Sequence, residues 1–312
     1  MQKRNYLNTL INRNNKIFDK SLLKFYSRID INKFRNTIFT YFDTYGGKEY
    51  PEFPVENRII KLVPRKISNY ISDKKMLGQL VEKYNLNNIF PKTYFDIRSA
   101  LKAYQKNKSM KLAYIKNRYG TGGKQVRCIH SSDIQSVHLA KDEIIQEEVQ
   151  NIFLINSRKI TIRLYLIVFD KCLFLSKYAW GMIHGEEYDK NNPNYDIQIK
   201  HEGYINKNSK IKMFSLEESK EANQWFISSV NKIRESSILY EEIRLNTNKD
   251  NYIILGIDGI PTQKNEVMFI EVNSYPNFYH VEKINNKVNI PMISSVINLI
   301  LVGKDSSEFI QV

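Results

Sequence analysis

Two strand-like segments near the end of the chain, residues 253–260 and 266–274, limit the fold more than any other feature of the sequence. Both are rich in apolar and β-branched residues, and only the short loop 261–265 separates them. So short a connection predicts an antiparallel hairpin, because parallel strands need a much longer crossover. The chain is therefore expected to contain antiparallel sheet and not a doubly wound parallel sheet.

Further helices and strands are predicted along the rest of the chain. Apolar periodicity and turn residues predict strands at 58–63, 91–94, 111–117, 125–129, 144–149, 159–169 and 172–180. They predict helices through most of 1–50, over 72–84 behind a Ser72 or Asp73 cap, and over 99–106, 216–233 and 290–302. The order of these elements predicts an α+β fold.

The hairpin carries three oxygen-bearing side chains. Side chains alternate along a strand, so Glu271 and Asn273 share one face, and pairing across the loop brings Asp258 close to Glu271. Two carboxylates and an amide oxygen suit a hard cation such as magnesium. The ordinary alternative is a polar, half-exposed hairpin face, but the lack of a basic neighbour on either carboxylate's own strand favours the metal site.

A basic face is predicted on the long strand 159–169. Its odd positions begin with Lys159, Thr161, Arg163 and Tyr165, whereas the even positions are apolar. An ammonium and a guanidinium in line on a rigid strand could hold phosphate oxygens. A solvated strand face explains the same pattern, but the acidic hairpin beside it favours a nucleotide and metal site.

A glycine-rich turn, with Gly120, Gly122 and Gly123, follows the strand that ends in Lys116 and Asn117. Such turns let backbone amides approach phosphates closely. The turn does not have the spacing of a Walker A loop, and the β-like segment after it argues against a dinucleotide-binding fingerprint. The prediction is a glycine flap between two strands.

Composition narrows the class of protein further. The formal net charge is +14, which favours anionic ligands, but no basic low-complexity tract accompanies it, so there is little support for a nucleic-acid partner. No apolar run reaches the roughly 18 residues of a membrane span. Cys128 and Cys172 are expected to be buried, reduced thiols of a cytoplasmic protein. The five histidines show no zinc spacing, and no GxSxG motif is present.

These segments together resemble the ATP-grasp superfamily and, within it, the tubulin-tyrosine ligase-like family, over residues 72–277. Lys116 before the glycine flap is similar to the nucleotide-binding lysine of the family, and Lys74 to an earlier phosphate-binding lysine. Lys159 and Arg163 match the family's "K-x-D-x-R" strand, with Thr161 in place of the aspartate.

The remaining matches concern the metal and the adenine. Gly256-Ile257-Asp258 resembles "G-x-D", and the segment from Glu271 through Asn273 to Pro276 resembles "E-x-N-x-x-P", the motifs that carry the magnesium ligands. The family's adenine-binding hinge strand is matched by Gln146, Glu147, Glu148 and Val149. The chain departs from the family where "H-x-T-N" is expected, since 199–206, with His201, echoes that motif only loosely.

The resemblance implies an ATP-grasp fold in three parts, with an N-terminal domain over 1–65, a central subdomain with the flap over 66–148 and a C-terminal subdomain with the metal site over 149–312. It also implies an ADP-forming ligase that uses ATP and Mg²⁺ to join a carboxylate to an amine through an acyl phosphate. Arg163 and Lys159 would be its catalytic residues.

The substrate remains open at this stage. One option is the addition of an amino acid to a protein or peptide, with an acidic tail suggested by the positive charge. Another is the synthesis of a small peptide, a natural product or a cell-surface component. A basic module that binds nucleic acid or acidic protein through a degenerate nucleotide site is the non-enzymatic alternative.

Overall fold

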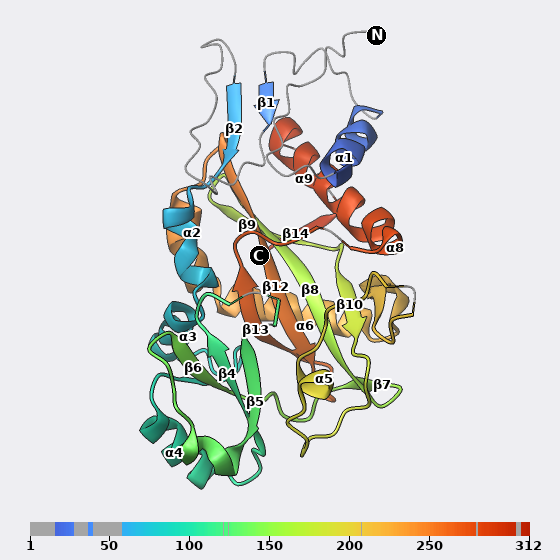
Figure 1. Cartoon of the computed structure of the whole chain (residues 1–312). Helices are drawn as coiled ribbons and strands as arrows, with labels where there is room; N and C mark the ends of the chain where they lie inside the picture. Colours follow the sequence, from blue (N-terminus) through green and yellow to red (C-terminus); the bar gives the residue numbers. More distant parts are fainter. Residues whose placement is uncertain are drawn as a thin grey trace.

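The computed structural model describes residues 16–27, 37–39, 58–120, 122–123, 125–206, 208–278, 280–303 and 307–312, and these residues form a mixed α+β fold built on two sheets (Figure 1). The smaller sheet has the order β3-β6-β4-β5 and is antiparallel throughout. The larger sheet has ten strands around the path β1-β2-β12-β8-β10-β11. It is mixed, because β2 runs parallel to both β1 and β12. The prediction of α+β structure is therefore confirmed, with antiparallel pairing dominant in both sheets.

The strands of the smaller sheet are β3 (Thr93–Tyr94), β4 (Leu112–Asn117), β5 (Val126–His130) and β6 (Glu143–Glu147). Those of the larger sheet are β1 (Thr37–Phe39), β2 (Arg58–Leu62), β7 (Leu154–Ile155), β8 (Arg158–Phe169), β9 (Cys172–Ser176), β10 (Trp180–Ile183), β11 (Lys212–Ser215), β12 (Asn251–Pro261), β13 (Val267–Asn273) and β14 (Phe309–Gln311). The α-helices are α1 (Lys16–Tyr26), α2 (Arg65–Ser72), α3 (Lys74–Lys83), α4 (Ile97–Lys106), α5 (Tyr195–Gln198), α6 (Ala222–Glu235), α7 (Glu241–Leu245), α8 (Glu282–Ile284) and α9 (Ile290–Val302).

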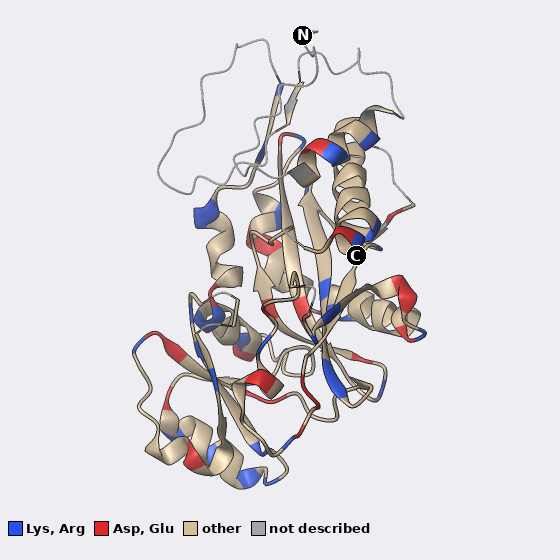
Figure 2. Cartoon of the chain, turned by 45° about the vertical axis from the view of Figure 1, so that its right-hand side comes forward, with Lys and Arg blue, Asp and Glu red and all other residues tan. Residues whose placement is uncertain are grey.

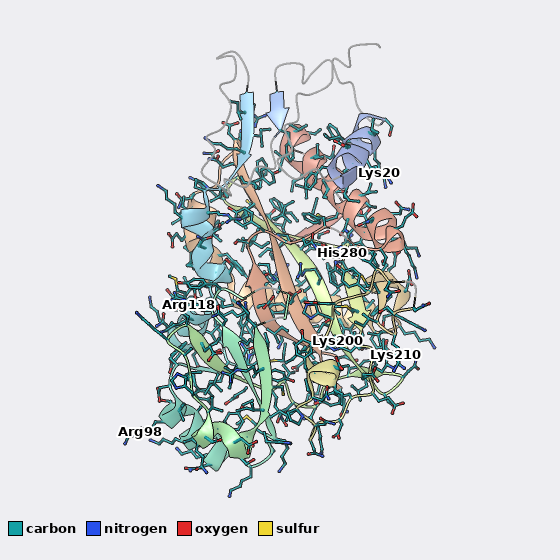
Figure 3. All side chains as sticks on the ribbon, in the orientation of Figure 1. Lys20, Arg98, Arg118, Lys200, Lys210 and His280 are labelled. Carbon is teal, nitrogen blue, oxygen red and sulfur yellow. The ribbon has the colours of Figure 1, made fainter. Side chains whose placement is uncertain are left out.

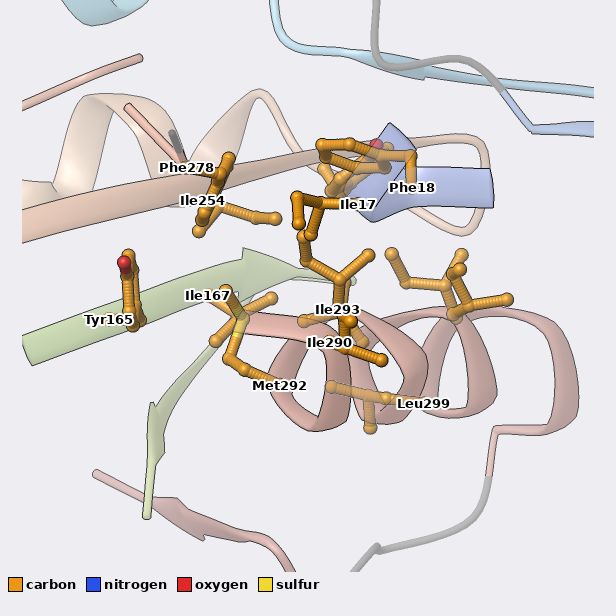
Figure 4. Packing of buried hydrophobic residues seen from close by; sticks show 14 of the residues in the cluster. Ile17, Phe18, Tyr165, Ile167, Ile254, Phe278, Ile290, Met292, Ile293 and Leu299 are labelled. Carbon is orange, nitrogen blue, oxygen red and sulfur yellow. The ribbon is translucent and has the colours of Figure 1, made fainter. Parts of the chain in front are cut away.

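Two hydrophobic cores cover the two faces of the large sheet, and the alternation along β8 assigns its side chains to them. Tyr165 and Ile167 join the core under α1 and α9 (Figure 4), whereas Leu164 and Leu166 join the core that includes residues of α2, α3 and α6. These side chains are fully buried, so β8 is the central strand of the molecule. A rigid strand that is packed on both faces can hold the polar side chains at its other end in fixed positions.

The N-terminal prediction is confirmed at α1 and wrong at residues 37–39. Residues 37–39 were expected to be helical, but Thr37–Phe39 forms β1, parallel to β2, and the Phe39 ring stacks on Tyr252 at 5.0 Å. The β-branched and aromatic residues of this segment favour a strand, and the helical prediction gave that preference too little weight. The helix α1 agrees with the prediction, and residues 1–15, 28–36 and 40–57 lie outside the described residues.

Two predicted elements are interrupted in the structure, whereas the predicted helix 72–84 is confirmed with its Asp73 cap. The segment 172–180 forms β9 and the start of β10, because Lys177 turns aside to bond Glu308 in the approach to β14. The predicted helix 216–233 begins as a short 3-10 turn and becomes α6 only at Ala222. The predicted helix 72–84 is α3, and a further helix, α2, precedes it; Met76 and Tyr84 of the expected apolar face are exposed.

The distribution of charged residues agrees with the sequence prediction, whereas the burial of the two thiols does not. In Figure 2 the Lys and Arg segments are spread over both sheets and mixed with Asp and Glu, as their spacing in the sequence predicts. Cys128 and Cys172 are free thiols, but both are partly exposed, because each lies near a sheet edge and not in a core. Within the described part of the chain, no helix is long and apolar enough to cross a membrane.

Candidate nucleotide and metal site

A cavity of about 620 Å³ lies between the two sheets. Its walls come from β4 and β6 of the small sheet and from β8, β10, β12 and β13 of the large sheet, with α3 at one side. Of the residues that the sequence predicts for the site, the structure brings the following to this cavity: Lys74, Lys116, Gly120, Gly122, Gly123, Gln146, Glu147, Val149, Lys159, Arg163, Asp258, Glu271 and Asn273. Segments almost 200 residues apart thus meet at one place.

Glu148 is the predicted residue that does not line the cavity. Its carboxylate turns into the small sheet and accepts hydrogen bonds from the backbone N–H groups of Lys111 and Leu112. The strand β6 ends at Glu147, so Glu148 lies beyond the regular alternation, and its carboxylate is held by the backbone of the segment that leads into β4. Contrary to the prediction, the structure therefore does not bring the Glu148 side chain to the cavity.

The acidic hairpin has the predicted register. Asp258 of β12 stands directly opposite Glu271 of β13, and the strands shift register just after Asp258 at a β-bulge. The Asn273 amide donates to Asp258 Oδ2 and to Glu271 Oε1, each at 3.1 Å. One amide thus holds two carboxylates at a common point, which opposes the repulsion between them.

Arg163 neutralises one of these carboxylates. It stands opposite Asp258 in the β8–β12 ladder and forms a bidentate ion pair with it, in which Nη2 lies 2.8 Å from Oδ2. Burial opposes the charge, but Asp258 raises the pKa of Arg163, so the guanidinium stays ionised. Gly256 makes room for it, since a Cβ there would lie 3.0 Å from Arg163 Nη1 and 2.8 Å from Pro276 Cβ.

Lys74 neutralises the other carboxylate and also holds the flap. Its Nζ lies 3.5 Å from Glu271 Oε2 and donates to the carbonyl oxygen of Gly120 at 2.6 Å. Burial raises the pKa of Glu271, but the charges of Lys74 and Lys116 outweigh it and hold that pKa well below the ordinary value. Glu271 is therefore an anion at any physiological pH.

Lys74 is placed by the start of α3. Asp73 caps this helix by accepting from the backbone N–H groups of Lys75 and Met76, and it also pairs with Arg118 at the root of the flap. Figure 3 shows Arg118 at the junction of α3 and the small sheet. The cap therefore fixes the helix, the flap root and Lys74 together.

Two further lysines are buried in the cavity wall. Lys116 donates to Gln146 Oε1 at 2.6 Å, and Lys159 donates to the carbonyl oxygen of Gln198 at 2.8 Å, with its ammonium 5.2 Å from the centre of the Tyr114 ring. Burial lowers the pKa of each lysine to about 8. Neither lysine has a carboxylate within ion-pair distance among the described residues. An anionic ligand would therefore stabilise the charged form of both lysines.

The flap touches a loop from the other side of the cavity. Gly122 and Gly123 both have positive φ, at 67° and 73°, and a Cβ on Gly123 would lie 2.8 Å from Cε1 of His201. His201 belongs to the segment that loosely echoes the family motif, so this residue does reach the cavity. The flap and the 199–206 loop can therefore close over the same ligand.

Replacing Gly123 with alanine is expected to weaken the binding of an anionic ligand beneath the flap by about tenfold, because the new Cβ would lie 2.8 Å from His201 Cε1, so that the flap or this ring must shift. Isothermal titration with Mg–ATP measures the effect. Gly122→Ala is the matched control: its φ is equally positive, but its Cβ would meet only Glu202 Oε1, at 3.9 Å. Equal losses in both variants would show that backbone strain, and not the contact with His201, is responsible.

Sequence reasoning missed the aromatic end of the cavity. Trp180, Tyr204, Tyr275 and His280 line it beyond Arg163, whose guanidinium lies 5.6 Å from the centre of the Trp180 ring. Of these four residues, only Trp180 could have been assigned to the cavity from the sequence, because it is a large residue in the strand that pairs with the basic strand. Tyr204, Tyr275 and His280 lie in connecting segments, where no periodicity shows which side chains turn inward.

The donor set at the hairpin fits a magnesium ion. The described part of the chain holds no cluster of three or more His, Cys, Asp and Glu side chains suited to a metal. Magnesium often takes only one or two carboxylates from the protein and completes its shell with water and phosphate oxygens. Asp258 and Glu271, with the Asn273 amide between them, match that pattern.

The chain matches no protein-family model and no curated protein.

Proposed function

We propose that the chain is an ATP-grasp ligase of the ADP-forming kind, which activates a carboxylate with ATP and joins it to an amine. The observation that carries this proposal is the meeting of Lys74, Lys116 and Arg163 with the Asp258–Glu271 pair in one cavity between two antiparallel-rich sheets. Cations from three separate elements can hold a polyphosphate, while the carboxylates hold its metal. A plain polar hairpin face gives no reason for this convergence.

Each residue has a task in the proposed reaction. The small sheet and Val149 hold the base of ATP, with Gln146 and Glu147 at the edge of that subsite. The phosphates lie against Lys74, Lys116 and Lys159, beneath the glycine flap. Asp258 and Glu271, with Asn273 beside them, would hold Mg²⁺, and the ion would supply positive charge next to the phosphates. Arg163 faces the γ-phosphoryl group from β8.

The bonds balance in two steps. A carboxylate oxygen of the substrate forms a bond to the γ-phosphorus as the bond to the bridging oxygen breaks, and ADP leaves. The amine then attacks the acyl carbon, the C–O bond breaks, and the phosphate that leaves takes up the proton that the amine loses. Arg163 stabilises the charge of the transferring group, and closure of the flap on His201 keeps water from the acyl phosphate.

The substrate class that we propose is an amino acid or peptide. The excess of basic residues suits an acidic peptide or protein tail as the second partner. A ligase that makes a small peptide, a natural product or a cell-surface component would use the same nucleotide site. The two differ only in what enters the aromatic end of the cavity.

The test is ATP turnover by the purified full chain with magnesium, across the twenty amino acids and a set of Glu-rich peptides. Nucleotide products are separated as ADP or AMP. We expect ADP and phosphate only when a particular carboxylate and amine are both present. Release of AMP and pyrophosphate would overturn the acyl-phosphate mechanism. Absence of Mg–ATP binding, together with salt-dependent binding of nucleic acid, would instead support the binding-module alternative.

A pH-dependent signature of ATP binding follows from the buried lysines. Burial lowers the pKa of Lys116 and Lys159 to about 8, so near this pH each is partly neutral in the free protein. A bound triphosphate stabilises the ammonium form and raises both pKa values. Binding is therefore expected to take up about half a proton per lysine near pH 8 and almost none near pH 6.5.

Calorimetric titration of Mg–ATP in two buffers of different ionisation enthalpy measures this uptake. In Lys116→Met the uptake near pH 8 should fall by about half. The same shifts make the ligand-free protein more stable as the pH rises from about 8 to about 10.5, because the unfolded chain binds more protons in that window. Equal proton uptake at the two pH values would contradict the assignment.

A further inference from the structure

A buried chain of hydrogen bonds runs behind the aromatic end of the cavity. The Trp180 indole N–H donates to the Tyr165 hydroxyl oxygen at 3.1 Å, and that hydroxyl donates to Asn289 Oδ1 at 3.1 Å. Asn289 Nδ2 then lies 2.8 Å from Nδ1 of His280. Tyr165 and Asn289 are fully buried and Trp180 is 6% exposed, so water does not compete with these bonds.

The Trp180 indole, the first group in this series of hydrogen bonds, fixes which group donates and which accepts at each step. An indole N–H can only donate, so the Tyr165 oxygen accepts from Trp180 and its single proton is left for Asn289. Asn289 must accept that proton with its Oδ1, which turns its NH₂ group towards His280. The NH₂ group can only donate, so His280 Nδ1 is an acceptor and the ring proton is on Nε2.

A break in helical geometry places Asn289 for this role. Residues Asn285–Asn289 form a π-helical turn between α8 and α9, and such turns often occur at functional sites. The Asn289 NH₂ group also donates to Asn285 Oδ1 at 2.8 Å, and the Asn285 amide donates to the His280 carbonyl oxygen at 2.7 Å. The amide of Asn289 is thus held in one orientation from both ends.

His280 is placed where a ligand can meet it. It lines the cavity and is 8% exposed. Its ring packs edge-to-face on Trp180, with 4.8 Å between the ring centres, and Figure 3 labels His280. The Trp180 ring also lies beside the guanidinium of Arg163. Because Nδ1 is engaged, Nε2 is the nitrogen left for a ligand, and among the described residues it makes no hydrogen bond.

The imidazole is neutral as well as oriented. Burial, together with the nearby charge of Arg163, lowers the pKa of His280 to about 3. At physiological pH the ring is therefore a fixed N–H donor that neither gives up nor takes a proton. Such a donor can stabilise an oxyanion without acting as an acid or a base.

We propose that His280, with its tautomer fixed by the Trp180–Tyr165–Asn289 chain, donates its Nε2–H to an anionic oxygen of the group that receives the phosphoryl from ATP. This proposal rests on the proposed ligase function. The oxygen belongs to the acyl phosphate, either to its phosphoryl end or to the carboxylate from which it forms. Tyr165 and Asn289 are positioning residues, since they act through His280.

The experiment uses the full chain labelled with ¹⁵N-histidine, and His280→Gln assigns the resonances of His280. Two-bond ¹H–¹⁵N spectra report which nitrogen carries the proton. Mg–ADP is then added, followed by inorganic phosphate in one arm and acetate in the other. We expect the Nε2–H tautomer in the free protein and a downfield shift of the Nε2 proton in the arm whose anion meets His280.

Variants test the contact by affinity. His280→Phe keeps a ring against Trp180 but removes the N–H donor. It should lower the binding affinity for the anion that shifts the Nε2 proton by about tenfold or more. His280→Gln keeps an N–H donor and should restore part of that affinity. Mg–ADP binding should be unchanged in both, which also shows that both variants fold. A purely structural role would not move the Nε2 proton when the anion is added.

The outcomes separate the two proposals. An Nδ1–H tautomer, or no shift with either anion while Mg–ADP binds, overturns the role of His280 and leaves the ligase proposal standing. A shift with phosphate alone assigns the contact to the phosphoryl end, and a shift with acetate alone assigns it to the carboxylate. Failure of Mg–ADP to bind overturns the proposed function and, with it, the oxyanion role.

Discussion

In the proposed ligase, replacing Glu271 with glutamine is expected to lower ATP turnover by about a thousandfold or more, because the proposed metal site would lose a charged ligand and, with it, several kcal/mol of charge stabilisation in the transition state. Glutamine keeps the volume and one oxygen of Glu271, so the loss reports the charge. The amide also leaves Lys74 and Lys116 without the carboxylate that faces them. We expect Mg–ATP binding to weaken as well. The magnesium concentration that is needed for half-maximal ATP binding should rise.

The control for this variant lies in the same hairpin. Glu266→Gln changes an exposed carboxylate at the turn before β13, outside the cavity, and should leave turnover unchanged. Initial rates of ADP release measure both variants, and their circular dichroism and unfolding midpoints show whether the fold is retained. Wild-type rates in Glu271→Gln would exclude this carboxylate as a metal ligand.

The site was predictable to the extent that it lies on strands. Side chains alternate with a period of two, so Glu271 and Asn273 had to share a face, and the short loop fixed Asp258 opposite Glu271. The same alternation placed Lys159 and Arg163 together on β8. It also placed Tyr165 on this side of the strand, where the side chain is buried in the core with residues of α9 and does not line the cavity.

What sequence could not supply is the packing of one element against another. Residues 37–39 form a strand that pairs with β2; their β-branched and aromatic side chains suit a strand, but the sequence does not show which strand would pair with them. His280 enters the site through contacts with Trp180 and Asn289, which come from β10 and from the π-helical turn before α9. Such contacts depend on how the connecting segments cross the sheet, and no local pattern encodes that path.

The second large effect is expected in Arg163→Met, and it concerns stability as well as turnover. The guanidinium and the Asp258 carboxylate are 13% and 16% exposed, so removing one partner leaves a largely buried charge without compensation. Breaking such a pair typically costs about 3–5 kcal/mol of unfolding free energy. Burial already raises the pKa of Asp258, and without the opposing charge of Arg163 this pKa rises further.

The sign of the pH dependence follows from that shift. A carboxyl group whose pKa is higher in the folded than in the unfolded chain adds stability at low pH, and this stability is lost as the pH rises through the folded pKa. Arg163→Met should therefore recover part of its lost stability as the pH falls through the folded pKa of Asp258, and it should recover more than the wild-type protein gains, because Arg163 limits the rise of this pKa in the wild type. Urea unfolding at several pH values measures this difference.

Two further variants separate the buried charge from other effects of the substitution. Arg158→Met removes an arginine at the exposed start of the same strand, whose nearest bond is a 3.4 Å contact to the Lys210 carbonyl oxygen, so it should change stability by less than about 1 kcal/mol. Arg163→Met combined with Asp258→Asn removes both charges and should regain most of the stability, because an uncharged buried pair has no desolvated ion to compensate. Turnover should stay low in that double variant, since neither the guanidinium nor the metal-binding carboxylate is restored. A double variant as unstable as Arg163→Met alone would mean that Arg163 stabilises the fold through its packing on Trp180 and not through its charge.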